Sequence, residues 1–266
     1  MADPPLDSAF VRASYEADGP VAHYARAADT VGLWRSERRL IDRLFRLNDR
    51  ILDLGCGAGR TTLALARLGY RHIEGIDQSG RLIKAAWARA GALPVSFSVA
   101  DARELPYPDR CFDAAFFSFN GLMTIPGRLE RIRAMAEVAR VLRPGGVFLF
   151  TTHDRDENEQ FRGFWKAEAR RWRKGKRDSR IPEFGGILFD HDGAPSFIHV
   201  PDRAEVLDSI AQAGLEWTED HWRGDLAQEP PQVEEFALPC RFWVARRALA
   251  EDREERPSVG HHRPGD

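Results

Sequence analysis

The residues best suited to chemistry gather in one short stretch, DLGCGAG at residues 53–59. Its glycines let the backbone approach a ligand closely, and the amides that open a following helix attract an anion. A dinucleotide-binding loop requires Gly or Ala at the sixth position from Gly55, where this chain has Arg60. The carboxylate of Asp53 would repel a pyrophosphate and suits a ligand with a cationic amine. The pattern therefore disfavours a nicotinamide dehydrogenase.

This loop lies between two predicted elements. Residues 50–54 form an apolar run typical of a buried parallel strand, and residues 61–68 have helical spacing that ends at Gly69. The alternation continues with strands at 72–77, 95–99, 112–119 and 147–152, and with helices at 81–90 and 129–142. Strands that alternate with helices predict an α/β fold with a doubly wound, mostly parallel sheet.

The segments outside this run have other patterns. Residues 15–47 have helical spacing, and residues 154–200 interrupt the alternation as an insertion of helix and loop. The alternation resumes with a helix at 204–213 and strands near 215–218 and at 236–245. The charged, proline-containing residues 249–266 predict a disordered tail.

The composition excludes several classes of protein. Lys plus Arg is 39 and Asp plus Glu is 41, so a net charge of −2 gives no general attraction to nucleic acid or membrane. No apolar run approaches the roughly 18–20 residues that span a bilayer, and residues 1–10 do not resemble a secretory signal. Three separated cysteines favour a reducing compartment and predict a cytoplasmic protein without a structural metal. The pair His261-His262 is expected to be inert.

Several segments in order resemble the class I S-adenosylmethionine-dependent methyltransferases, over residues 49–152. The glycine loop matches the first motif of that family, and Asp77 and the pair Asp101-Ala102 end the next two strands. Leu105-Pro106, Phe112-Asp113 and residues 142–146 also match, as structural segments. The resemblance implies a seven-stranded Rossmann-like sheet, S-adenosylmethionine as the cofactor and an enzyme that transfers methyl groups.

The resemblance also assigns roles to residues of the cofactor site. In that family the acidic glycine loop holds the methionine end, the acid that ends the second strand binds the ribose hydroxyls, and the segment after the third strand recognises adenine. The cofactor contacts implied or expected here are Asp53, Gly55, Cys56, Gly57, Gly59, Asp77, Gln78, Asp101, Ala102 and Phe119.

Four of these residues have structural alternatives. Asp77 could be an acid next to the helix cap Ser79, and Asp101 a turn residue. Cys56 is better explained as a small buried side chain than as a nucleophile. Phe119 could belong to the core or could flank the sulfonium, where an aromatic face adds about 1 kcal/mol.

The stretch after the fourth strand bears on the methyl acceptor. Amine and nucleobase methyltransferases of the family often carry an Asn/Asp-Pro-Pro-aromatic tetrad there, and only Asn120 matches it here. A small molecule, methylated on O or N, is therefore the favoured acceptor. His153 follows the fifth strand, at the sheet edge where α/β folds place their sites, and is the candidate general base. The alternative is a structural histidine held by loop backbone.

Two aromatic segments could cover the acceptor. The candidate substrate contacts are Tyr15, Tyr24, Trp34, Asn120 and Trp165. Aromatic side chains suit an apolar pocket, but packing against the sheet is the favoured explanation because aromatic residues usually belong to the core. The basic run at residues 170–180 could bind RNA, but a solvated helix face is the favoured interpretation, so nucleic acid is not the expected partner.

These inferences divide the chain into five segments. They are an N-terminal helical cover (1–48), a cofactor-binding core (49–153), an insertion or substrate lid (154–200), the completion of the core (201–248) and the tail (249–266). Two alternatives to a small-molecule methyltransferase remain, an RNA methyltransferase and a non-catalytic cofactor-binding scaffold. The sequence is compatible with a monomer or a homodimer.

Overall fold

The apolar runs of the sequence form one seven-stranded sheet in a computed structural model that describes residues 6–156 and 159–249. The predicted tail beyond Leu249, with the pair His261-His262, lies outside the described residues. In sheet order the strands are β3 (Val95–Val99), β2 (His72–Asp77), β1 (Arg50–Leu54), β4 (Phe112–Phe117), β5 (Leu142–Thr152), β9 (Arg241–Arg247) and β8 (Leu215–Trp222). The first five are parallel, and β9 runs antiparallel to both of its neighbours.

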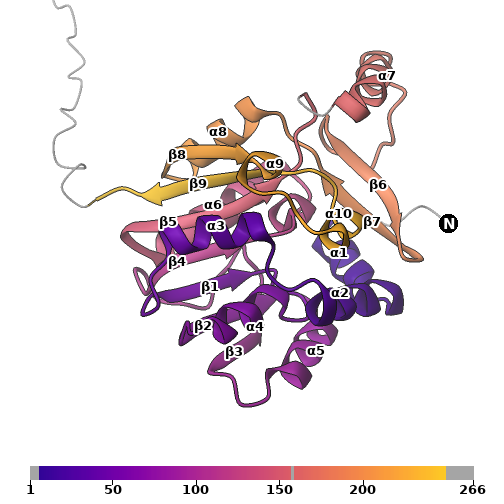
Figure 1. The fold of residues 1–266 in the computed structure, drawn as a ribbon. Coiled ribbons are helices and arrows are strands. Elements are labelled where there is room, and N and C mark those ends of the chain that lie inside the picture. The colour runs from indigo at the N-terminus through magenta and orange to yellow at the C-terminus, as the bar shows by residue number, and fades with distance from the viewer. Residues whose placement is uncertain (1–5, 157–158, 250–266) are drawn as a thin grey trace, which may run out of the picture.

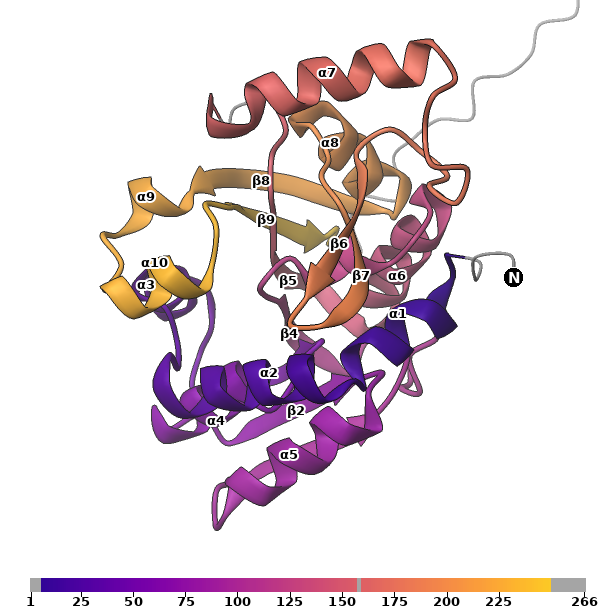
Figure 2. The same cartoon turned by 90° about the vertical axis from the view of Figure 1, so that its right-hand side faces the viewer.

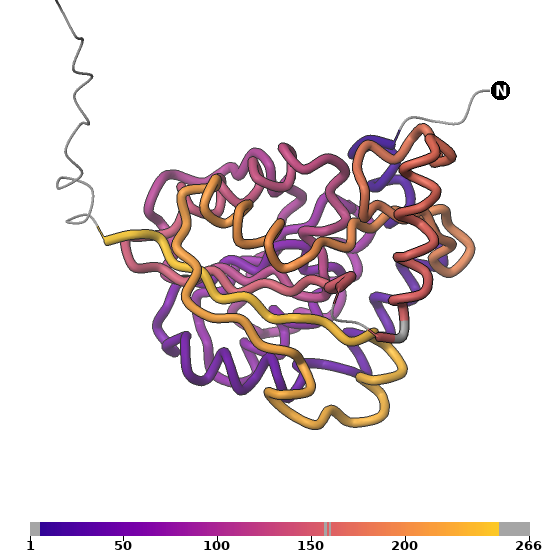
Figure 3. Tube along the Cα trace, turned by 90° about the horizontal axis from the view of Figure 1, so that it is seen from above, coloured from indigo at the N-terminus to yellow at the C-terminus, as the bar shows by residue number. Residues whose placement is uncertain are grey.

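Both faces of the sheet are apolar, as the nearly continuous apolar strands predict. Along β4, Ala114 and Phe116 contribute to one hydrophobic cluster and Ala115 and Phe117 to the other. Helices cover both faces, so the sheet is the middle of three layers (Figures 1 and 3). One face packs against α3 (Arg35–Leu44), α4 (Arg60–Arg67), α5 (Gly80–Ala90), α9 (Arg223–Leu226) and α10 (Pro231–Phe236), and the other against α6 (Arg128–Val141) and α8 (Arg203–Gln212).

The N-terminal helical region consists of three helices rather than one continuous pattern. Before α3 come α1 (Ser8–Tyr15) and α2 (Asp18–Thr30). Figure 2 looks at the carboxyl ends of the parallel strands and shows α1 and α2 lying across that end of the sheet. The N-terminal segment therefore covers the sheet edge where the glycine loop lies.

The insertion contains a β-hairpin as well as a helix. After the short 3₁₀ helix η2 (Glu159–Phe161) come α7 (Arg162–Arg173) and the antiparallel strands β6 (Gly186–His191) and β7 (Ala194–His199). Asp192 and Gly193 form the turn with φ of 49° and 85°, the left-handed values of a two-residue hairpin turn. The Asp-Gly dipeptide is thus the sequence signal for the hairpin. The predicted insertion of helix and loop is incomplete, because it lacks these two strands.

Four predicted strands have different limits in the structure. The strand expected at 147–152 begins at Leu142, and the one expected near 215–218 extends to Trp222. The strand expected at 112–119 ends at Phe117, because Phe119 and Asn120 have φ of 54° and 59°. The strand expected at 236–245 begins at Arg241, because Pro231 starts the short helix α10 before it. Within the described ranges, no helix has both the length and the apolar character needed to cross a membrane.

Candidate functional site

A cavity opens at the carboxyl ends of β1, β2 and β4, beneath α1 and α2. This edge of an α/β sheet is where ligands bind. The cavity is lined by nine of the residues predicted to contact cofactor or substrate: Gly55, Gly57, Asp77, Gln78, Asp101, Ala102, Phe119, Tyr15 and Tyr24.

The glycine loop approaches the cavity with its backbone. Gly55 has a φ of 59°, and a Cβ at this position would lie 2.6 Å from the Phe117 ring. The amide of Cys56 donates to the carbonyl of Ile76, which ties the loop to β2 at 2.9 Å. A larger residue at position 55 would displace either the ring or the loop, so the motif requires glycine there.

Asp77 is the acidic group most firmly held at the cavity wall. The amide of Gly57 donates to Oδ2 at 3.0 Å, and that of Ser79 donates to Oδ1 at 2.9 Å. Burial raises the pKa of this carboxyl to about 6, against the lowering effect of those two amides. Each oxygen keeps accepting capacity toward the cavity, so the carboxylate can accept two hydrogen bonds from a diol. Ser79 caps α5 as predicted, by accepting from the amide of Leu82.

Three predicted contacts lie behind the loop and do not line this cavity: Asp53, Cys56 and Gly59. Thr61 and Thr62 both donate to Oδ2 of Asp53, the latter at 2.6 Å. Its Oδ1 is buried and has no hydrogen-bond partner among the described residues. Burial raises the pKa of Asp53 to about 6 and that of the Cys56 thiol well above its usual value. A neutral, buried thiol matches the structural interpretation of Cys56.

Asp101 also lines the cavity and is paired with a residue that sequence reasoning missed. The Arg103 guanidinium donates to Oδ2 of Asp101 at 2.6 Å and also reaches Glu130 at 2.8 Å. Although partial burial opposes it, this contact lowers the pKa of Asp101. Arg103 itself lines the cavity. The signal for it was the Asp-x-Arg spacing, which allows a side chain to fold back on an acid two residues earlier.

Phe119 and Asn120 occupy two strained positions after β4. Left-handed backbone is costly for residues other than glycine, and it concentrates at functional sites. The Phe119 ring lines the cavity and packs against Tyr24, with 5.9 Å between ring centroids. The backbone N–H of Asn120 donates to Oγ1 of Thr151 at 2.8 Å. The side chain of Asn120 does not line the cavity.

His153 is held through both ring nitrogens. Nδ1 lies 2.9 Å from the carbonyl of Pro239, so Nδ1 is the donor, and Nε2 accepts from Nδ2 of Asn120 at 3.1 Å. Burial lowers the pKa of His153, which keeps it neutral. It does not line the cavity. In this arrangement the His153 ring positions the side chain of Asn120.

Trp34 is fully buried within the cover, beside a charged network that the sequence did not reveal. Arg60 makes a two-pronged pair with Glu37 of α3, with nitrogen–oxygen distances of 2.7 and 2.8 Å. It also donates to Ser118 at 2.8 Å, and Ser118 lines the cavity. Arg60 lies over the Trp34 ring at 5.0 Å. Arg60, the residue that departs from the dinucleotide-binding pattern, thus joins the N-terminal cover to the glycine loop.

Trp165 and the basic run lie in the insertion, away from the cavity lining. Trp165 is buried against Phe164 and Phe184, at centroid distances of 5.0 and 5.9 Å. Most cations of the run are exposed on or just after α7, and Arg180 pairs with Asp178 at 2.6 Å.

The donor and acceptor groups of the cavity fit the cofactor that the resemblance implies. Asp77 offers a buried carboxylate to a diol, and the glycine backbone offers close approach without side chains. The orphaned Oδ1 of Asp53 is an acceptor suited to an ammonium group. Apolar walls include Val11, Ile76 and Leu82.

Comparisons with known proteins agree with this chemistry. A family model described as a methyltransferase domain matches residues 51–146. The ubiquinone/menaquinone biosynthesis C-methyltransferase UbiE of Rickettsia akari is 32% identical over 198 residues, 69% of this chain and 74% of the relative. The 27-O-demethylrifamycin SV methyltransferase of Amycolatopsis mediterranei is 38% identical over 127 residues. That match spans only 44% of this chain and 45% of the relative.

Solved structures show the same fold. A methyltransferase described as S-adenosylmethionine-dependent, from Methanosarcina mazei, superposes with a TM-score of 0.64 at 24% identity. The superposition covers 79% of this chain and 97% of that one. It confirms the predicted class of sheet.

Proposed function

Because the chain belongs to the class I S-adenosylmethionine-dependent methyltransferases, a family of enzymes with that cofactor, we propose that it methylates an O or N atom of a small molecule. The observation that carries the proposal is the cavity that Asp77 and the glycine loop form beneath an aromatic cover. Of the relatives named above, one is described as a C-methyltransferase of ubiquinone/menaquinone biosynthesis and the other as a 27-O-demethylrifamycin SV methyltransferase. Both names indicate small-molecule acceptors.

On the cofactor side, we propose that Asp77 holds the ribose hydroxyls and that Gly55 and Gly57 approach the methionine end. Asp101, fixed by Arg103, and Ala102 flank the adenine, and Asp53 supports the ammonium group from behind the loop. The bound cofactor supplies a methyl group already activated on a sulfonium. The protein therefore has to align an acceptor with that methyl and exclude water.

On the acceptor side, Tyr15, Tyr24 and Phe119 line the cavity beneath the cover, with Ser118 and Thr124 as nearby hydroxyls. Burial raises the pKa of Tyr15 to about 12 and that of Tyr24 well above its usual value, so both phenols stay neutral and can donate a hydrogen bond to an acceptor oxygen. Rings and hydroxyls in this arrangement suit a neutral, mostly apolar acceptor. The segments 1–48 and 154–200 are accordingly proposed as substrate covers.

His153 as the general base stays a prediction. Its Nε2 is the atom that would take the proton, and Asn120 occupies it at 3.1 Å. Proton transfer to His153 therefore requires the acceptor to displace the Asn120 amide. The variant His153→Ala is expected to lose most turnover and to keep cofactor affinity. Full activity would assign the base elsewhere or show that none is needed.

A labelled-methyl assay tests the proposed function. The protein is incubated with S-adenosylmethionine carrying a trideuterated methyl group and with separate panels of phenols, hydroquinones, amines and RNA. Mass spectrometry is expected to find a labelled methyl on a small molecule, and NMR of the product is expected to assign it to O or N. Label on carbon, label on RNA alone, or cofactor binding without transfer to any panel would contradict the proposal.

A further inference from the structure

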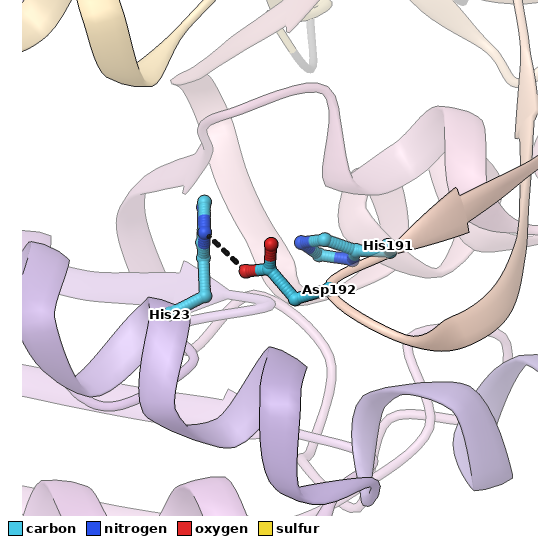
Figure 4. A group of neighbouring side chains, drawn as sticks. All are labelled: His23, His191 and Asp192. Carbon is cyan, nitrogen blue, oxygen red and sulfur yellow. Dashed lines mark ion pairs between the residues drawn. The ribbon is translucent and has the colours of Figure 1, made fainter.

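Two histidines and an aspartate meet where the N-terminal cover touches the insertion (Figure 4). His23 comes from α2, and His191 and Asp192 come from the tip of the β6–β7 hairpin. One ligand-type atom from each residue lies within 4.8 Å of the others. These residues are 168 positions apart in sequence (191 − 23), so no local motif accounts for the group.

The imidazole of His23 lies against the carboxylate of Asp192, and the two form an ion-pair contact. Nδ1 of His23 lies 2.8 Å from Oδ2 of Asp192, and the nitrogen is buried without a hydrogen-bond partner among the described residues. Nδ1 of His191 is likewise buried and unpartnered there. The imidazole and carboxylate atoms therefore face a common region without satisfying one another, as they do around a metal ion.

The backbone holds the hairpin tip firmly against α2. A Cβ on Gly19 would lie 1.8 Å from the carbonyl oxygen of Asp192, so glycine is required for this approach. His23 lies one helical turn after Gly19, on the same face of α2. The hairpin turn is itself stabilised, since the amide of Gly193 donates to Asp190 at 2.9 Å. The three side chains are thus placed by packing that does not depend on their own contact.

The charge of the group favours a cation. Imidazole nitrogens and a carboxylate oxygen, the groups that meet here, are donors that coordinate a metal ion once they are deprotonated. Asp192 contributes a negative charge, with Asp190 nearby and Arg26 as the nearby cation. By contrast, the carboxylates of the second such group, Glu183, His199 and Glu205, already pair with arginine, at 2.8 Å from Arg131 to Glu183 and 3.2 Å from Arg155 to Glu205.

We propose that His23, His191 and Asp192 bind a divalent transition-metal ion of the zinc type. Two imidazoles and one carboxylate are ligands that this class of ion prefers. Ligand atoms at about 2.0–2.2 Å from an ion lie roughly 3–3.5 Å apart, so the side chains need to shift by only about an ångström. The ion would join the hairpin tip to α2. His191 packs against the rings of Tyr15 and Tyr24, which line the cavity, so this clasp would hold the cover over the acceptor side.

Titration of the full chain with zinc alone, followed by calorimetry, tests the proposal without any cofactor or acceptor. We expect one ion per chain. Each of the variants His23→Gln, His191→Gln and Asp192→Asn is expected to weaken binding at least about tenfold. Asparagine tolerates the left-handed backbone at position 192, so Asp192→Asn preserves the hairpin turn. Cobalt in place of zinc should give the visible absorption of a four- or five-coordinate site, and this band should vanish in the same variants.

Two control variants separate this site from adventitious binding. His72→Gln removes an exposed histidine on β2, and the double variant His261→Asn/His262→Asn removes the histidine pair of the tail. Both should bind zinc as the unaltered chain does. Absence of one-to-one binding would overturn the proposal, as would binding that survives all three site variants or disappears only with the tail pair. Because no methyl transfer is measured, failure here would leave the proposed function standing.

Discussion

The two halves of the cavity are held together in different ways. In the half made by strand ends, backbone hydrogen bonds tie the glycine loop to β2, and the Gly57 amide orients Asp77 at 3.0 Å. In the half made by the covers, side chains from distant segments meet instead, such as Ser14 with Ser196 and His23 with Asp192. The cofactor half is therefore built into the sheet, whereas the covers are assembled from contacts between segments far apart in the sequence.

The two halves are joined by the buried group of Glu37, Arg60 and Ser118. Glu37 belongs to the cover and has a fully buried side chain, and Arg60 begins the helix that follows the glycine loop. Although burial opposes the charge on Arg60, Glu37 raises the pKa of the guanidinium, which therefore stays charged. A substitution in this group is therefore the most direct test of how the two halves are joined.

The largest expected effect is that of Glu37→Gln. The substitution leaves the Arg60 guanidinium buried without its counter-charge, which costs about 3–5 kcal/mol. Chemical denaturation should show that loss in the free energy of unfolding. The matched control is Asp42→Asn, which breaks the pair Arg38–Asp42 whose side chains are 46% and 48% exposed. That change should cost less than about 1 kcal/mol. Equal losses in the two variants would contradict the role given to the Glu37–Arg60 pair.

The next effect belongs to the cofactor half and depends on pH. Burial raises the pKa of Asp53 from 3.8 to about 6, so the folded state binds its proton more tightly than the unfolded state. Its contribution is fully present below pH 4 and is lost as the pH rises through about 6. Relative to Asp53→Asn, the unaltered protein should therefore lose about 2 kcal/mol of unfolding free energy between pH 4 and pH 7. A constant difference between the two proteins across that range would show that Asp53 titrates normally.

The smallest effect is expected from the basic run of the insertion. Arg170, Arg171 and Arg173 are exposed on α7 and do not line the cavity. Their triple replacement by Gln should leave cofactor affinity unchanged and unfolding free energy within about 0.5 kcal/mol per residue. Fluorescence anisotropy with labelled polyuridylate should show weak binding in both proteins. Tight binding that weakens steeply with salt and is lost in the variant would favour the RNA alternative.

The cofactor half could be predicted from sequence because each of its residues follows a strand end. Gly55, Asp77 and Asp101 sit at the carboxyl ends of β1, β2 and β3, and parallel strands bring those ends to one edge. Apolar runs that end at glycine predicted these strands. The seven-stranded sheet agrees with the predicted fold class. The limits of β1, β2 and β3 agree with the predicted ranges.

The cover half could not be predicted in the same way. Its contacts join residues such as Arg60 to Glu37 and Asp192 to Gly19, and no periodic pattern relates positions so far apart. The strained backbone of Phe119 and Asn120 is also invisible to propensity, because tertiary contacts impose it. His153 followed a strand end as expected, yet its ring lies against Pro239 and Asn120 instead of the cavity. A strand end places a residue at the right edge of the sheet but does not set the direction of its side chain.

The central claim is that Asp77 and the glycine loop bind the cofactor, and calorimetric titration with S-adenosylmethionine and S-adenosylhomocysteine tests it most directly. We predict micromolar affinity for both ligands. Asp77→Asn should weaken both by about 1–3 kcal/mol, roughly 5- to 150-fold, because charge-assisted hydrogen bonds to the ribose are lost. The exposed Asp225→Asn serves as the control and should bind normally. Failure to bind either ligand, or unchanged affinity in Asp77→Asn, would contradict the account.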